Sequence, residues 1–382
     1  MWKEAVFRTI QNYPGISRLK MAKKLKMRAN TVSDIVQELI DEGIVRETKK
    51  KMTGKRGRPI KMLEFWSQRF VCISIYPEDF TLIGSLIDMG DTTLAETEVF
   101  LPPDTDNRRF LGVLDSLLGF LVSKIPSGSE LIGAGISLVG TIDDYAKVWI
   151  EATRWSHIRN IAFVPVEKRI GIPIVLKRWL DTELEYQLMQ IPECNTGNFL
   201  LFHWCMGIGA AFSHKGQVIN SRFGKFADIG HMIVDSESER ICRCGQKGCL
   251  EAIASSWALL PIFRKEYPVM QETNYNVKKA LTETNVYENL EFRYSLYMVK
   301  KTFANMLRLL FPDKIFFIGP FLQDARISRE FTREIEEVYS QRMYRGRGTK
   351  KQISTEVIHD QLRFCKIANV RPFFKEKLQT LL

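Results

Sequence analysis

Histidine and cysteine are scarce in this sequence, with five His and seven Cys among 382 residues. No stretch approaches the roughly 18–20 apolar residues that a membrane-spanning helix needs, and the first residues lack the order of a secretory signal. An odd number of thinly spread thiols argues against a secreted disulfide framework. We therefore expect a cytoplasmic protein with no membrane partner. Its hydrophobic content of 45% and charged content of 26% exclude a disordered chain.

Positive charge is concentrated at one end of the chain. At about 150 residues per domain, the length predicts two or three domains. Residues 1–62 hold sixteen Lys and Arg against six Asp and Glu, so they carry ten of the eleven net positive charges. A basic head on a nearly neutral body indicates a module that binds a polyanion, joined to a domain with a different role.

Apolar spacing in the basic head predicts three helices, over residues 2–10, 17–25 and 30–42. Ser17 is a candidate N-cap, and the inner face of the second helix is expected to hold Leu19, Ala22 and Leu25. Short strands over residues 44–47 and 62–65 would flank a basic, glycine-containing wing. Two short helices joined by a tight turn, followed by a wing, are typical of a winged helix-turn-helix.

This head is predicted to bind double-stranded DNA. The outward face of its third helix offers side chains that can contact base edges or phosphates: Arg28, Asn30, Thr31, Ser33 and Gln37. The wing offers Lys55, Arg56 and Arg58 among small glycines, which suits a narrow, A·T-rich minor groove. The alternative is a solvated basic surface on a small helical domain.

The remaining chain alternates strands with helices, which indicates an α/β domain with a mixed sheet. A helix is expected over residues 110–125, another follows residue 176, and the chain is expected to finish in helices; the expected strands cover 70–75, 80–87, 98–101, 131–138, 174–176, 199–204 and 314–318. A glycine turn over residues 206–212 has two interpretations. Its backbone N–H groups approach a phosphate, or it joins a simple hairpin, which we favour.

Three thiols lie within eight residues, at Cys242, Cys244 and Cys249, and His231 lies eleven positions before the first of them. Three Cys and one His complete a closed tetrahedral Zn²⁺ site, which is structural because it leaves no position for a reactive water. The alternative is three incidental buried thiols. The isolated cysteines are expected in the core: Cys72, Cys194, Cys205 and Cys365.

The segment DIGH at 228–231, followed by CRCGQKGCLE at 242–251, resembles the signature of the ROK family (repressors, open reading frames and sugar kinases). Glycine-rich stretches at 133–140 and 206–210 resemble other parts of that family. The resemblance implies an α/β fold with two actin-like (ribonuclease H-like) lobes around a cleft. A winged helix-turn-helix ahead of this body is what ROK transcriptional regulators have and ROK kinases lack.

The resemblance also implies an order of domains: a winged helix-turn-helix over 1–66 and a ROK domain over 67–382. Within the ROK domain we expect a first lobe at 67–182, a second lobe with the zinc site at 183–360, and a C-terminal helix at 361–382. It further implies a homodimer or homotetramer, a sugar or sugar-derived effector in the cleft, and a structural Zn²⁺ on His231, Cys242, Cys244 and Cys249.

By the same resemblance, the effector would contact Asp228, which replaces a family Glu, together with His231 and Glu251. Two motifs of the family's kinases are missing. Residues 74–78 lack the Gly-Gly-Thr that holds ATP, and the Asn-Asp pair with the catalytic base falls, counted from Pro173, on Arg178 and Trp179. Neither side chain can take a proton at neutral pH. We therefore expect no kinase activity.

Arg178 and Trp179 are themselves candidate effector contacts. The indole can stack on a sugar ring, and Arg178 with Lys177 can pair with a carboxylate or phosphate. The hypothesis is an acidic or phosphorylated sugar, or the loss of a neutral-sugar site. An outward Arg beside a core Trp is the alternative.

The sequence thus predicts a DNA-binding regulator, a repressor tuned by a carbohydrate-derived effector. Two alternatives remain open. One is an ATP-dependent sugar kinase with an appended DNA-binding head. The other is a constitutive DNA-binding scaffold whose cleft has no ligand.

Overall fold

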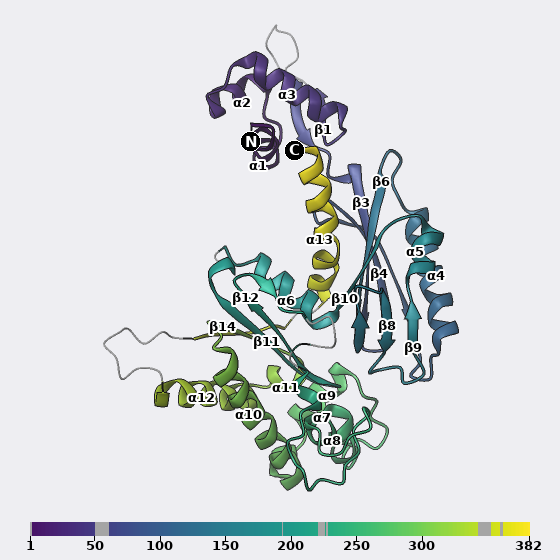
Figure 1. Ribbon diagram of the computed structural model, residues 1–382, viewed down its shortest axis with the longest axis vertical. Coiled ribbons are helices and arrows are strands. Elements are labelled where there is room, and N and C mark those ends of the chain that lie inside the picture. The colour runs from purple at the N-terminus through teal and green to yellow at the C-terminus, as the bar shows by residue number, and fades with distance from the viewer. Residues whose placement is uncertain are drawn as a thin grey trace.

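The computed structural model describes residues 2–49, 61–192, 194–220, 226, 228–342, 353–359 and 362–382. The wing residues Lys55, Arg56 and Arg58 lie outside these ranges. Cys365 lies in a described helix, but its side chain is not described. A small N-terminal head and two larger lobes follow one another along the long axis of the molecule (Figure 1). No helix in the described part of the chain is long and apolar enough to cross a membrane.

The head is a winged helix-turn-helix, as predicted. It consists of α1 (Trp2–Asn12), α2 (Arg18–Leu25) and α3 (Ala29–Asp41), with an antiparallel pair of β1 (Val45–Lys49) and β2 (Lys61–Phe65). The Ser17 hydroxyl caps α2 by accepting from the backbone N–H of Lys20. The predicted inner face of α2 is wrong at Leu19, which is 62% exposed, whereas Met21 is buried. At about 100° per residue, Met21 shares a face with Ala22, and Leu19 lies beyond its edge.

The first lobe is built on a five-stranded sheet in the order β10-β6-β3-β4-β5. Its strands are β3 (Phe70–Glu78), β4 (Thr81–Asp88), β5 (Thr93–Phe100), β6 (Glu130–Leu138) and β10 (Ile174–Arg178), preceded by the short η1 (Ser67–Arg69). Two helices, α4 (Asn107–Ser123) and α5 (Val164–Ile170), pack into the core on one face of this sheet. A second, three-stranded sheet adjoins it: β7 (Thr141–Asp143), β8 (Val148–Glu151) and β9 (Arg159–Ala162).

The second lobe repeats the strand order of the first, as β13-β12-β11-β14-β15. In both sheets the first strand along the chain is central, pairs antiparallel with the second and runs parallel to the fourth. The strands are β11 (Asn198–Trp204), β12 (Ile208–His214), β13 (Gln217–Val218), β14 (Lys314–Ile318) and β15 (Ser354–Val357). This repetition confirms the two-lobed actin-like α/β fold. The hairpin interpretation of the glycine turn is correct, while β15 near the chain end was not expected. The residue limits of the lobes stay a prediction.

Helices cover both faces of the second sheet. The first, α6 (Trp179–Met189), packs on one face. The other face carries α10 (Leu290–Leu310), α11 (Pro320–Gln323) and α12 (Ala325–Arg342). The shorter elements of this lobe are η2 (Cys194–Thr196), η3 (Ile229–His231), α7 (Leu250–Ala254), α8 (Ser256–Phe263), α9 (Asn274–Glu283) and η4 (Val286–Glu288).

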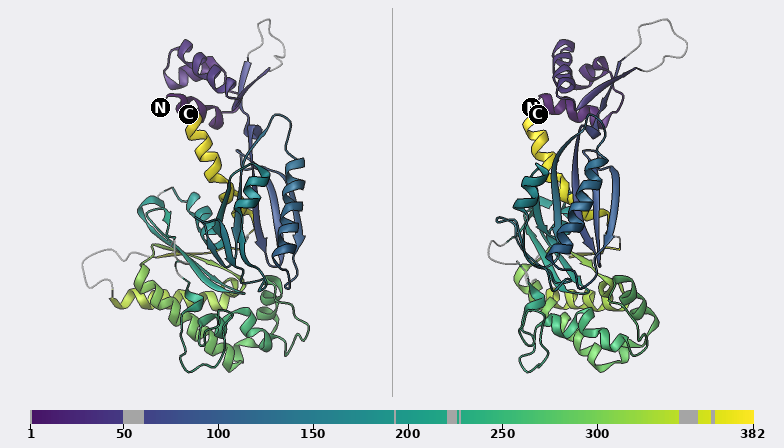
Figure 2. Two further views of the ribbon diagram at one scale, coloured as in Figure 1. Left: turned by 45° about the vertical axis from the view of Figure 1, so that its right-hand side comes forward. Right: turned by 90° about the vertical axis from the view of Figure 1, so that its right-hand side faces the viewer.

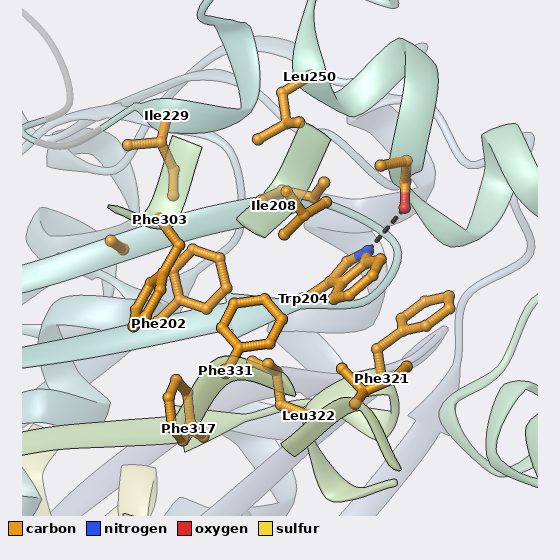
Figure 3. Packing of buried hydrophobic residues seen from close by; sticks show 14 of the residues in the cluster. Phe202, Trp204, Ile208, Ile229, Leu250, Phe303, Phe317, Phe321, Leu322 and Phe331 are labelled. Atoms are coloured by element: carbon orange, nitrogen blue, oxygen red, sulfur yellow. Dashed lines mark hydrogen bonds between the residues drawn. The ribbon is translucent and has the colours of Figure 1, made fainter. Parts of the chain in front are cut away.

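Aromatic side chains fill the core of the second lobe (Figure 3). The Trp204 ring stacks on Phe321 with centroids 4.5 Å apart. Its indole N–H donates to the Ala254 carbonyl at 2.6 Å, the bond drawn in Figure 3. Because Trp204 ends β11 and Ala254 ends α7, this contact holds α7 against the sheet. The position of Glu251, one turn earlier on α7, is therefore set by the core.

The last helix, α13 (Leu362–Leu381), lies on the face of the first sheet opposite α4 and reaches the head, so that the two chain ends meet (Figures 1 and 2). Its Val370 and Phe374 are buried in the same apolar cluster as Val6 and Phe7 of α1. Glycine in β6 permits this close packing. A Cβ at Gly135 would lie 2.3 Å from the Asn369 carbonyl oxygen.

Asn369 also carries a buried hydrogen-bond network. Its side-chain Nδ2–H donates to the Ser74 hydroxyl at 3.0 Å, and its side-chain Oδ1 accepts from the Ser137 hydroxyl at 2.6 Å. Ser137 in turn shares a hydrogen bond of 2.7 Å with the Thr182 hydroxyl. One fully buried side chain thus joins α13 to β3, β6 and α6.

We expect Asn369→Ala to lower the free energy of unfolding by about 2–4 kcal/mol, because it leaves the buried Ser74 and Ser137 hydroxyls without their amide partner. The measurement is urea denaturation followed by circular dichroism. Asn305→Ala, on the exposed face of α10, is the matched control and should change stability by less than about 0.5 kcal/mol. Equal stability of the two variants would contradict the structural role of the network.

Candidate functional site

The outward face of α3 is exposed, as the sequence predicts. Arg28, Asn30, Thr31 and Gln37 are exposed and Ser33 is half-buried. The opposite face packs into the head through Val32, Val36 and Leu39. These polar side chains therefore lie on a surface that a major groove can reach.

Four metal-ligating side chains converge as expected: His231, Cys242, Cys244 and Cys249. Their ligand atoms all lie within 4.8 Å of one another. The Cys244 and Cys249 sulfurs are 3.7 Å apart, and the Cys242 sulfur is 3.4 Å from His231 Nδ1. A tetrahedral Zn²⁺ with Zn–S bonds of about 2.3 Å needs sulfurs roughly 3.8 Å apart. The donor set and its spacing therefore fit this metal.

Local backbone geometry brings these ligands together. Gly245 donates its N–H to the Cys242 carbonyl in a tight turn. Gly248 has a φ of +74°, and a Cβ there would lie 2.0 Å from the Asp235 carbonyl oxygen, so glycine is required. His231 ends η3, and Cys249 is the N-cap of α7. A metal on these four ligands would tie η3 to α7.

Two adjoining cavities, of about 90 Å³ and about 770 Å³, lie between residues of the two lobes. The small cavity is lined by all five side chains that the sequence assigned to the effector: Arg178, Trp179, Asp228, His231 and Glu251. Glu251 is buried, and its carboxylate accepts from the Ile208 N–H of the glycine turn at 3.3 Å. The structure thus brings the five residues together, while their role stays a prediction.

Arg178 already has partners within the chain. It is 8% exposed, and its guanidinium donates to the Asp181 carboxylate at 2.6 Å and to the Ala210 carbonyl at 2.8 Å. Lys177 pairs with Glu185. The alternative of an outward Arg is therefore wrong, and the two cations that were expected to meet an anionic effector are neutralised by carboxylates of their own chain.

The small cavity is also lined by residues that the sequence did not single out, among them Thr153, Arg154 and His203. Burial, with the nearby charge of Arg154, lowers the pKa of His203 to about 3, so its imidazole is neutral. The indole of Trp179 meets the His203 ring edge-on at 5.6 Å. Thr153 and Arg154 lie between β8 and β9, and no motif in the sequence marks them or His203.

Two hydrogen bonds cross between the lobes beside the large cavity. The Asp79 carboxylate accepts from the Asn274 N–H at 3.3 Å, at the start of α9. Arg243, between two metal-ligating cysteines, donates to the Thr153 carbonyl at 3.3 Å. The segment from Cys242 to Cys249, which carries three of the candidate metal ligands, therefore contacts the first lobe directly.

Comparison with known proteins assigns the family, because the ROK family pattern matches residues 80–360. The chain belongs to the ROK family. Relatives include the DNA-binding transcriptional dual regulator NagC of Escherichia coli K12, 24% identical over 339 residues, with 85% of this chain and 81% of NagC covered. The xylose repressor of Bacillus spizizenii is 25% identical over 252 residues, covering 66% of this chain and 64% of its own.

Solved ROK structures support the same fold. A ROK family transcriptional regulator, a homolog of the E. coli MLC protein, covers 98% of this chain and 96% of its own, with a TM-score of 0.70 and 19% identity. A ROK glucokinase from Streptomyces griseus, with glucose and AMPPNP, covers 79% of this chain and 99% of its own, with a TM-score of 0.57 and 16% identity. The match to the ROK regulator structure thus spans nearly the whole of this chain, including the head.

We expect the purified protein to hold about one zinc per chain and Cys244→Ser to lose it, because three remaining ligands no longer close the tetrahedron. Metal content after dialysis, measured by mass spectrometry, checks this. Cys194→Ser, at an isolated half-buried cysteine, should keep the metal. A wild-type protein that takes up no stoichiometric zinc would contradict the site.

Proposed function

We propose that this ROK protein is a DNA-binding transcriptional regulator, a repressor whose DNA affinity is set by a carbohydrate-derived effector. The observation that carries the proposal is the winged helix-turn-helix joined to a ROK body, in a chain that a ROK regulator structure matches over 98% of its length. The names of the relatives, a dual regulator and a xylose repressor, support it.

In this proposal α3 enters the major groove. Arg28, Asn30 and Gln37 contact base edges, Thr31 and Ser33 contact phosphates, and Lys55, Arg56 and Arg58 of the wing enter the adjacent minor groove. A homodimer or homotetramer would present two heads to a pseudo-palindromic site. The ten excess positive charges of the head supply a salt-dependent attraction to any duplex.

The effector site in this proposal is the small cavity. The carboxylates of Asp228 and Glu251 accept hydrogen bonds from sugar hydroxyls, and His231 contributes the ring nitrogen that the metal leaves free. Zn²⁺ supplies a fixed link between η3 and α7, which carry these residues. A ligand that binds one arrangement of the lobes better also changes DNA affinity, and the coupling is reciprocal.

We also propose that the chain has no kinase activity. Where ROK kinases carry their catalytic base, this chain has Trp179 after an Arg178 that binds Asp181. Asp181 is buried in that ion pair and is not free to accept a proton from a sugar hydroxyl. Without a base and without the Gly-Gly-Thr cradle, phosphoryl transfer loses both deprotonation and phosphate positioning.

Asn30→Ala and Arg28→Ala should each weaken binding to a DNA site selected from a random pool by roughly 5–150-fold, because each loses a contact to a base. Fluorescence anisotropy at fixed salt measures this effect. Asn305→Ala, far from the head, should bind like the wild type. Unchanged affinity in both head variants would contradict the proposed use of α3.

Incubation with ATP and glucose should release no ADP above the sugar-free background in a coupled assay, with a ROK glucokinase run in parallel as the positive control. Sugar-dependent ADP release that disappears in Asp181→Asn would reverse this conclusion and favour the kinase alternative.

A further inference from the structure

The small cavity alone cannot hold a ligand of the usual small-molecule size, whereas the two adjoining cavities together can. Its volume of about 90 Å³ lies well below the roughly 300–1,000 Å³ of typical small-molecule sites. The neighbouring cavity of about 770 Å³ lies within that range. The two share five lining residues: Thr153, Arg154, Met206, His231 and Glu251. A ligand on Glu251 and His231 therefore has a second, larger space directly beside it.

Part of the lining of the large cavity is apolar. It includes Phe80, which precedes β4, Phe100, which ends β5, and Leu260 of α8. Phe100 is 62% exposed, while Phe80 is fixed edge-on against Trp155. The exposed ring of Phe100 can pack against the apolar face of a pyranose or furanose ring.

The polar lining of the large cavity is balanced in charge. It holds four arginines and four acids, which are Arg154, Arg159, Arg243, Arg264, Asp79, Glu151, Glu251 and Glu272. Arg159 lies 3.5 Å from Glu151, and Arg243 lies 3.7 Å from Glu272. Such a lining offers many donors and acceptors but no excess positive charge for a phosphate or carboxylate. It suits a neutral ligand with many hydroxyl groups.

Arg154 is the side chain best placed to bind this ligand. It lines both cavities, and one of its five N–H groups donates to the Asp79 carbonyl at 2.7 Å. The other donors have no protein acceptor among the described residues. Glu272 lines the same cavity, and its pKa is raised by burial and lowered in part by the nearby charge of Arg154. A sugar hydroxyl between the two would accept a hydrogen bond from the Arg154 guanidinium and donate one to the Glu272 carboxylate.

We propose that the effector is a neutral saccharide of at least two rings. One ring occupies the small cavity against Asp228, His231 and Glu251, and the next occupies the large cavity between Phe100 and Arg154. This inference rests on the proposed function, since it names the class of effector for the same cleft. It replaces the expectation of an acidic or phosphorylated sugar, which depended on Arg178 and Lys177.

The test is calorimetric titration of the full-length protein with matched sugars. Glucose is compared with cellobiose and maltose, xylose with xylobiose, and N-acetylglucosamine with its β-1,4 dimer, while glucose 6-phosphate and glucuronate serve as anionic probes. We expect one disaccharide to bind at least tenfold more tightly than its monosaccharide and than both anions. Phe100→Ala should weaken disaccharide binding by roughly tenfold and leave the monosaccharide unchanged.

Phe120→Ala is the matched control, because Phe120 is also a partly exposed aromatic residue but lies on α4, away from the cleft. Three results would overturn the inference. The first is a monosaccharide or anion that binds as tightly as any disaccharide, and the second is an equal loss of monosaccharide and disaccharide affinity in Phe100→Ala. The third is no binding by any sugar of the panel at millimolar concentration.

DNA binding separates failure of this inference from failure of the proposed function. A monosaccharide that changes affinity for the selected DNA site as much as any disaccharide overturns the inference and supports an effector-controlled regulator. A disaccharide that binds through Phe100 but leaves DNA affinity unchanged supports the two-ring binding site and contradicts an effector-controlled regulator, favouring a constitutive scaffold.

Discussion

The packing of α13 against β6 is the contact on which the arrangement of the three parts depends. Gly133 and Gly135 remove the side chains that would collide with Phe373 and with the Asn369 backbone. The buried Asn369 then bonds to β3 and β6 and, through Ser137, to α6. Buried amides are costly unless fully bonded, so α13 has one favourable register. Its far end packs against the apolar cluster that contains the core residues of the head, so α13 links the head to the first lobe.

A second constraint governs the cleft. Burying the Arg178–Asp181 pair is favourable only because both groups are bonded to each other and Arg178 also to the Ala210 carbonyl. Removing one partner of such a pair typically costs about 3–5 kcal/mol, because the other charge stays buried alone. The pair therefore fixes Arg178 and Asp181 to each other at the start of α6. This ion pair is the structural basis for our proposal that Asp181 does not act as a catalytic base.

Local signals made much of the fold and the metal site predictable. Helical spacing, the Ser17 cap and the run from Cys242 to Cys249 are patterns within a few residues. What escaped prediction depends mostly on contacts distant in the chain. Leu19 is exposed because the neighbouring helices pack on Met21, and β15 pairs beside β14. The ion pair of Arg178 with Asp181 is local, but its burial depends on the packing of α6 against the second lobe, where Arg178 also donates to the Ala210 carbonyl. Arg154 and Phe100 belong to no motif, and they become candidates because the fold places the end of β5 and the segment between β8 and β9 at the large cavity.

Regulation through this cleft is limited by the free energy that a ligand gains in one arrangement of the lobes over another. The hydrogen bonds that cross between the lobes beside the large cavity are long, at 3.3 Å for Asp79 with Asn274 and 3.3 Å for Arg243 with Thr153. Such bonds contribute little net stability on their own. A ligand held by Glu251 in the second lobe and by Arg154 and Phe100 in the first adds contacts that exist when both lobes close on it. A ring confined to the small cavity adds fewer of them, so under the proposed function the length of the ligand would determine how strongly the two lobes respond to it.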